Sequence, residues 1–141
     1  MSTEENKAIV RQVEEAWDSG NLDALDNLFA PNFIARNAVP GMPSGLEGAK
    51  MAHMGSVQAL PDRRTTIEDL LAEGDYVVAR VRMTGTNQGG FPWLGIPANS
   101  NKVDVQWTSL YRLADGKIVE HSAVMDMLGL LQQLGAIPAM A

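Results

Sequence analysis

The chain of 141 residues is 45% hydrophobic and 20% charged, proportions typical of a globular protein rather than a disordered one, so we expect one domain over residues 1–141. The net charge is −6 at pH 7, and the eleven Lys and Arg residues form no cluster able to neutralise adjacent phosphates, which argues against a nucleic-acid partner. The chain has no Cys and only two His, which argues against disulfides and against a metal site built from protein ligands.

Two features of the sequence argue against a membrane partner. The first residues, MSTEENK, have no basic start followed by an apolar stretch. No run of about 18 apolar residues occurs in the sequence. We therefore expect a cytoplasmic protein.

The N-terminal part of the chain predicts a pair of helices. Ser2 and Glu5 have the spacing of a capping box, and the first helix should run from about residue 4 to residue 18. Asn21 is a suitable N-cap for a second helix, which Pro31 would end. The apolar side of this second helix would consist of Leu22, Leu25, Leu28 and Phe29.

The middle of the chain changes from helical to strand patterns. Residues 33–45 are rich in Gly and Pro and predict an irregular loop around a short extended piece at residues 33–36. A third helix should follow at about residues 47–60. The strands expected after it cover residues 64–71, 75–85, 102–113 and 117–127.

Three further features complete the prediction. Asp115 and Gly116 indicate a tight hairpin turn between the last two strands. Residues 87–101 are rich in Gly, Pro and Asn and predict a loop with apolar side chains to bury, a lid or rim of a site. Residues 128–134 predict a short closing helix.

Helices followed by strands predict the α+β class, with the helices on one face of an antiparallel sheet. A strongly curved sheet wrapped around N-terminal helices would enclose a cavity. Small-molecule sites are usually concave, mostly apolar pockets with a few polar groups, so we expect a hydrophobic small-molecule ligand.

The C-terminal part of the sequence carries a specific resemblance. Residues 115–121 read DGKIVEH, and they are followed by Asp126 and by LGLLQQLG at residues 128–135. This pattern resembles the SnoaL-like polyketide and ester cyclases. Supporting segments are residues 29–33, Gly48, residues 84–86 and residues 95–97. The resemblance implies a cone-shaped fold related to nuclear transport factor 2 and ketosteroid isomerase, a homodimer formed through the sheet, and action on hydrophobic small molecules without a cofactor.

The resemblance also assigns candidate catalytic positions. In the cyclases, an Asp two positions after the His of the last strand is the general acid and base of an intramolecular aldol closure, and here that position is Ala123. A second family His, on the neighbouring strand, aligns with Ser109. His121 matches the family's His, and Asp126 matches an acidic position before the closing helix.

His121 and Asp126 are the catalytic candidates. An ordinary His pKa near 6.5 suits proton exchange at neutral pH, so we hypothesise that His121 is the acid or base; alternatively it only hydrogen-bonds a neighbour in the strand. Strand alternation directs His121 and Asp126 to opposite faces, unless a bulge restores convergence. Asp126 is also a candidate N-cap for the closing helix.

Two groups of residues, one at the expected cavity mouth and one on the third predicted helix, are binding candidates. Arg36 and Asn37 follow the extended piece, where ketosteroid isomerase relatives carry an acidic base; they could bind a ligand oxygen or form a solvated pair. His53 and Met54 lie on the third predicted helix, which could roof the pocket or expose them.

Four more side chains are binding candidates on the strands and the long loop. Trp107 and Ser109 share one face of a strand, where Trp107 is either core or a stacking surface for a flat ligand. Met125 could line a deformable pocket or fill the core. Phe91 lies on the Gly-rich loop and could cover a ligand or a partner subunit.

Two function hypotheses follow. The first is an enzyme that performs cofactor-independent aldol cyclisation or isomerisation of a hydrophobic carbonyl compound, with His121 and Asp126 as acid and base. The second is a binding module without turnover, which Ala123 and Ser109 at the family's acid and base positions would permit. A relative used for hydroxylation or another tailoring step in natural-product biosynthesis is a further alternative.

Overall fold

The computed structural model describes residues 2–37 and 41–138, and its elements follow the predicted order of helices and strands. The helices are α1 (Thr3–Ser19), α2 (Gly45–Ala59) and α3 (Met127–Gln133), with 3₁₀-helices at Leu22–Asn27 and Pro92–Leu94. The strands are β1 (Phe29–Ala35), β2 (Arg64–Glu73), β3 (Tyr76–Thr86), β4 (Lys102–Ala114) and β5 (Lys117–Met125).

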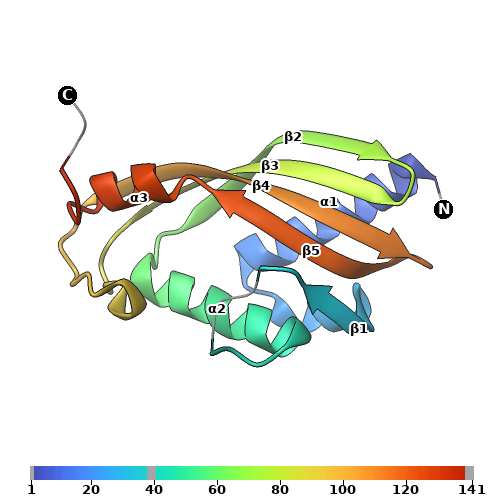
Figure 1. Cartoon of the computed structure of the whole chain (residues 1–141), viewed down its shortest axis with the longest axis horizontal. Helices are drawn as coiled ribbons and strands as arrows, with labels where there is room; N and C mark the ends of the chain where they lie inside the picture. The colour runs from blue at the N-terminus through green and yellow to red at the C-terminus, as the bar shows by residue number, and fades with distance from the viewer. Residues whose placement is uncertain (1, 38–40, 139–141) are drawn as a thin grey trace.

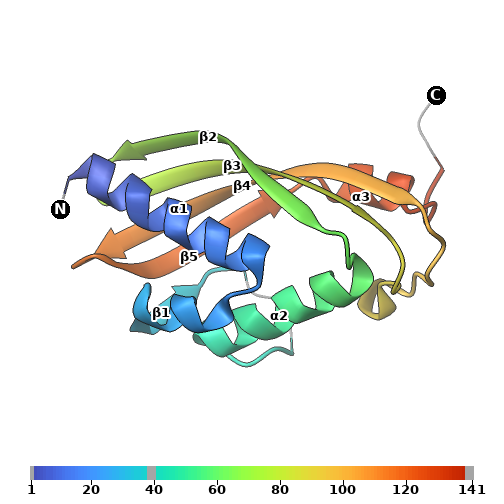
Figure 2. The same ribbon diagram turned by 180° about the vertical axis from the view of Figure 1, so that it is seen from behind.

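The five strands form one curved sheet in the order β1-β5-β4-β3-β2 (Figure 1). Strands β2 to β5 pair antiparallel, whereas β1 pairs parallel with β5. The helices cover one face of this sheet: α1 contacts β2 and β3, and α2 contacts β1 (Figure 2). The predicted α+β architecture, a curved sheet wrapped around N-terminal helices, is confirmed, but the prediction of a wholly antiparallel sheet is wrong, because β1 pairs parallel with β5.

The period-2 pattern of β4 positions side chains for the site. Its buried residues alternate with exposed ones along the strand. The inner face carries Val103, Val105, Trp107, Ser109, Tyr111 and Leu113.

In residues 2–37 and 41–138, no helix is long and apolar enough to cross a membrane.

Two local predictions are confirmed in detail. The Ser2 hydroxyl accepts from the Glu5 backbone N–H at 3.1 Å, and the Glu5 carboxylate accepts from the Ser2 backbone nitrogen at 3.3 Å, which completes the capping box. Asp115 and Gly116 have φ of 51° and 77°, the positive values that a type I′ hairpin turn requires.

The second predicted helix is wrong in type and in length. Residues Leu22–Asn27 form a 3₁₀-helix, and Phe29 begins β1 instead of continuing a helix to Pro31. Phe29 pairs with Ile118 of β5 and is buried in the core, so tertiary pairing and burial outweigh the helical spacing of the leucines. The expected loop at residues 33–45 therefore begins later, and its residues 38–40 lie outside the described part of the chain.

The segment between β3 and β4 is anchored rather than open. Asn87 is fully buried, its amide nitrogen donates to the Pro97 carbonyl and to the Asn99 side chain at 3.0 Å each, and its amide oxygen accepts from the Gly90 backbone. The side chain of Asn99 in turn donates to the carbonyl of Leu134 at 2.8 Å. These bonds fasten the segment to the C-terminal end of α3.

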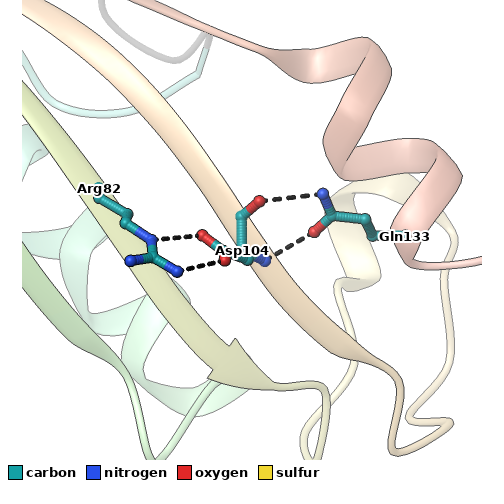
Figure 3. Close-up of polar contacts among 3 residues, drawn as sticks. All are labelled: Arg82, Asp104 and Gln133. Atoms are coloured by element: carbon teal, nitrogen blue, oxygen red, sulfur yellow. Dashed lines mark hydrogen bonds and ion pairs between the residues drawn. The ribbon is translucent and has the colours of Figure 1, made fainter.

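The Gln133 side chain bonds helix α3 to the start of β4 (Figure 3). The amide oxygen of Gln133 accepts from the Asp104 backbone N–H at 2.6 Å, and its amide nitrogen donates to the Asp104 carbonyl at 3.0 Å. The Asp104 carboxylate accepts two bonds from the Arg82 guanidinium, at 2.8 and 2.6 Å. The Gln133 amide thus satisfies the backbone N–H and carbonyl of Asp104, as the backbone of a neighbouring strand would.

Candidate functional site

A cavity of about 560 Å³ lies between the helices and the inner face of the sheet. Its volume is within the range of sites that bind drug-sized ligands. Much of its wall is apolar or aromatic, contributed by Trp17, Phe29, Phe33, Met83, Trp107 and Met125. The polar side chains in the wall come from α1, α2, β2, β4 and β5, from the segment after β1 and from the turn before β2.

Six of the ten predicted site residues line this cavity. They are His121, Asn37, His53, Trp107, Ser109 and Met125. The other four, Asp126, Arg36, Met54 and Phe91, are not among its lining residues. The β4 and β5 candidates come together because the two strands pair and these residues lie on the inner face of the sheet.

His121 is the centre of the polar arrangement on β5. Its Nε2 atom lies 3.0 Å from the Ser109 hydroxyl on the adjacent strand, and its ring packs against Tyr111 with centroids 4.7 Å apart. Burial lowers the pKa of His121 to about 4. The imidazole is therefore neutral at pH 7 and able to accept a proton.

The two positions at which the resemblance implies a His and an Asp in the cyclases are neighbours on adjacent strands. Ser109 and Ala123 are direct cross-strand partners in the β4–β5 ladder. Asn37 lies beside them: its amide nitrogen donates to the Ala123 carbonyl, and its amide oxygen accepts from the Ala123 backbone N–H at 3.1 Å. Asn37 thus orders the backbone next to His121 and presents an amide at the cavity wall.

Asp126 acts as the N-cap of α3. Its Oδ1 accepts from the Gly129 backbone N–H at 2.9 Å, and its side chain is exposed. A Cβ at position 129 would lie 2.3 Å from Asp126 Oδ2, so the glycine makes room for the cap. Of the two roles predicted for Asp126, the geometry supports capping.

The remaining three candidates have other partners or surroundings. Arg36 forms an ion pair with Glu120 at 2.9 Å, on the opposite side of β5 from His121. Met54 is an exposed residue of α2. Phe91 is 4% exposed and packs edge-on against Trp93 in a core cluster with Ile96, so it belongs to the packing of the loop.

Sequence reasoning missed a buried carboxyl in the cavity. Glu14 of α1 is 6% exposed, lines the cavity and accepts a hydrogen bond from the Tyr111 hydroxyl at 2.5 Å. Burial raises the pKa of Glu14, and burial also holds the pKa of Tyr111 well above its usual value. A signal for Glu14 existed, because it lies four residues after Val10 and three before Trp17, within the apolar stripe of the helix.

Arg63 was also missed, and no periodic pattern marks it. It follows α2 in the turn before β2, lines the cavity, and has its guanidinium carbon 6.0 Å from the Trp107 ring centroid. His53 lies in the same wall, and its Nε2 is buried without a hydrogen-bond partner in the described residues. Burial, together with the charge of Arg63, lowers the pKa of His53 to about 4.

The arrangement offers neutral imidazoles, a carboxyl with a raised pKa, hydroxyl groups and a guanidinium around an apolar space. Such groups can move protons and hold ligand oxygens. In residues 2–37 and 41–138, no three His, Asp or Glu side chains gather as a metal-binding group.

The chain is similar to a known protein family over most of its length. A family model for the SnoaL-like polyketide cyclase matches residues 7–134. Two curated relatives, both aklanonic acid methyl ester cyclases, match over 132 residues and 90% of this chain: DnrD of Streptomyces peucetius is 28% identical over 88% of its length, and DauD of Streptomyces sp. (strain C5) is 27% identical over 80%.

A solved structure agrees with these relatives. TsrD from Streptomyces laurentii superposes with a TM-score of 0.86 at 30% identity, covering 97% of this chain and 99% of its own. The family model extends from α1 to the end of α3, so it includes the strands that carry His121 and Ser109. The resemblance seen in the sequence is therefore confirmed, and the chain belongs to the SnoaL-like polyketide cyclase family.

Proposed function

We propose that the chain is a cofactor-independent enzyme that closes a ring in a hydrophobic carbonyl compound by an intramolecular aldol reaction. The observation that carries this proposal is the neutral imidazole of His121, held 3.0 Å from Ser109 in an apolar cavity of about 560 Å³. Family membership supports the reaction class, because the named relatives are methyl ester cyclases.

The proposed reaction needs one proton shuttle. The neutral His121 ring takes a proton from the acidic carbon beside a carbonyl group, which leaves an enolate and an imidazolium. The enolate carbon then forms the new C–C bond with a second carbonyl carbon of the same molecule. The resulting alkoxide recovers the proton from His121, so atoms and charge balance without an external oxidant or reductant.

The surrounding side chains support this chemistry in two ways. Apolar surroundings lower the local dielectric constant, which strengthens hydrogen bonds to a developing enolate oxygen. Asn37 presents an amide to the cavity while it holds the Ala123 backbone, so it lies where a carbonyl oxygen could be bound. Ala123 replaces the family's catalytic Asp, and we propose that His121 takes over its role.

The test is cyclisation of aklanonic acid methyl ester, the compound named for the curated relatives. We expect turnover by the wild-type chain and a loss of about 100-fold or more in His121→Gln. Ser122→Ala is a matched control, because Ser122 is the next residue of β5 and is not among the cavity-lining residues. Equal rates for His121→Gln and wild type would contradict the assignment.

A binding module is the second candidate function, and one observation favours it. The family's acid–base Asp and the second family His are both replaced, by Ala123 and Ser109, at directly paired positions. A carrier needs only shape and a few fixed donors, and the cavity supplies both. Tight binding of the methyl ester without any product formation would favour this function.

We also propose that two chains associate through the outer face of the sheet. Apolar side chains are exposed there, including Leu71 at 66% and Leu110 at 40%, and Val78 pairs with both across β2, β3 and β4. Exposed contiguous apolar patches commonly mark interaction sites. Sedimentation should show a dimer that Leu110→Lys dissociates and that Met51→Lys, on the exposed side of α2, leaves intact; a wild-type monomer would contradict the proposal.

A further inference from the structure

The guanidinium of Arg63, a charged group in the cavity wall, has no carboxylate partner among the described residues. Four arginines, Arg36, Arg80, Arg82 and Arg112, form ion pairs on the protein surface. Arg63, in contrast, lines the cavity and forms no ion pair with any carboxylate in the described residues. Its guanidinium donates only one bond to the described protein, from Nε to the Ser56 hydroxyl at 3.1 Å. The two terminal nitrogens are therefore left for another acceptor.

The nearest acidic side chains are already engaged. Asp18 influences Arg63 electrostatically, but its Oδ1 accepts from the backbone and the hydroxyl of Thr65, at 2.8 and 3.1 Å. Glu14 accepts from Tyr111 at 2.5 Å, and its burial favours the uncharged acid. Neither carboxylate lies within ion-pair distance of the guanidinium, so the positive charge of Arg63 is incompletely compensated.

The other basic groups of the cavity do not share this charge. The pKa values of His53 and His121 are both lowered to about 4, so both rings are neutral at pH 7. Burial lowers the pKa of Arg63 as well, but a guanidinium remains protonated in proteins at neutral pH. Among the described residues that line the cavity, Arg63 is thus the one cation.

The surroundings of Arg63 fit a planar oxygen group. A guanidinium presents its donors in a rigid fork that matches two oxygens side by side. The Nε bond to Ser56 and the Trp107 ring hold the fork in place, and the buried Nε2 of His53 lies unpaired in the same wall. An oxygen pair bound there would satisfy groups that the described protein leaves open.

We propose that Arg63 binds an anionic oxygen pair of the ligand, so that the substrate class is an apolar ring compound bearing a carboxylate or an enolised 1,3-dicarbonyl. This inference deepens the proposed function, on which it rests, by adding a charged anchor within a largely apolar wall. The carboxylate and the enolised 1,3-dicarbonyl have one feature in common: each presents two coplanar oxygens that carry one negative charge. An enolate bound at this point would also be stabilised as it forms.

The experiment uses three probes of similar shape: 2-naphthoate, its uncharged methyl ester, and 1-(2-naphthyl)butane-1,3-dione. Calorimetry gives the affinities for wild type, Arg63→Gln and Arg64→Gln. Arg64 is the matched control, because it is the adjacent arginine, is exposed, and is not among the cavity-lining residues. Absorbance of the dione enolate against pH gives its apparent pKa when bound.

We expect Arg63→Gln to weaken binding of 2-naphthoate by about 10- to 100-fold while the methyl ester changes by less than about twofold. Arg64→Gln should behave as wild type. If the ligand group is an enolised 1,3-dicarbonyl, the enol pKa of the dione should fall on binding to wild type and should not fall on binding to Arg63→Gln. A response of the carboxylate alone assigns the acid, and a response of the dione alone assigns the enolate.

Three results would overturn the inference: equal losses for acid and ester in Arg63→Gln, no loss for either anion, or no binding of either anion to wild type. Should Arg63→Gln fail to fold, Arg63→Lys keeps the charge but lacks the fork, and a selective loss for the anions of severalfold is expected. Because these measurements need no turnover, selective anion binding without cyclisation would reject the enzyme and retain the Arg63 site.

Discussion

The Nε2 atom of His121 and the hydroxyl of Ser109 lie 3.0 Å apart on neighbouring strands, inside the cavity. The hydroxyl can donate to this nitrogen or accept from it, so the contact couples the orientation of the hydroxyl to the tautomer of the neutral imidazole. In Ser109→Ala, we expect a changed balance of the two tautomers and a loss of about 1 kcal/mol of stability. Nitrogen-15 chemical shifts of the ring report the tautomers, and unchanged shifts would show that Ser109 does not set them.

The Glu14–Tyr111 pair predicts an asymmetric response to mutation. Tyr111→Phe removes the donor and leaves a buried carboxyl unpaired, so we expect a loss of about 1–3 kcal/mol in the free energy of unfolding. Glu14→Gln keeps an acceptor for the hydroxyl and removes a titratable group whose charged form burial disfavours, so it should cost less. Urea unfolding of both variants measures the difference, and a larger cost for Glu14→Gln would contradict this prediction.

Both histidines should make the protein less stable in mild acid. Their pKa values are about 4 in the fold against 6.5 in the unfolded chain, so between pH 6.5 and 4 the unfolded state binds more protons. The free energy of unfolding therefore falls as the pH falls through this window, by about 2 kcal/mol per histidine between pH 7 and 5. His121→Gln and His53→Gln should each lose less stability than wild type over this interval in urea unfolding. Parallel curves for all three proteins would refute the shifts.

Variants of Asp126 can distinguish its role as the N-cap of α3 from a role in catalysis. Asp126→Ala leaves the Gly129 N–H without its acceptor, so we expect a loss of about 1 kcal/mol, whereas Asp126→Asn should retain most of the stability. Cyclisation rates of the folded variants should equal that of wild type. A rate loss of about 100-fold in Asp126→Asn, without a loss of stability, would return Asp126 to the catalytic group.

Local signals in the sequence predicted the parts of the fold that short-range physics determines. The Asp115–Gly116 turn and the Ser2–Glu5 box depend on backbone preferences of a few residues, and both formed as predicted. Phe29 shows the limit of this reasoning. Its spacing fits a helix, yet its burial and its pairing with Ile118 depend on residues far away in the chain.

The candidate site shows the same limit: side chains on strands could be assigned to a face from the sequence, whereas contacts between distant residues could not. Strand alternation correctly placed Trp107 and Ser109 on one face of β4, but the contact between Ser109 and His121 depends on the pairing of β4 with β5, which alternation does not give. Glu14 was readable as a charged residue within an apolar helical stripe, but its partner Tyr111 is distant in sequence. Arg63 lies in a turn, where no periodic pattern indicates direction, so only the folded structure reveals that it lines the cavity.

The most direct test of the central claim is proton exchange at carbon, because it isolates the first step proposed for His121. The protein would be incubated in D2O at neutral pH with 1-tetralone, an apolar ring ketone, and deuterium incorporation beside the carbonyl followed by NMR. We predict exchange faster by about tenfold or more with wild type than with His121→Gln, and no difference between wild type and Ser122→Ala. Equal exchange with wild type and His121→Gln, at ketone concentrations that saturate the cavity, would contradict the account and favour a binding module.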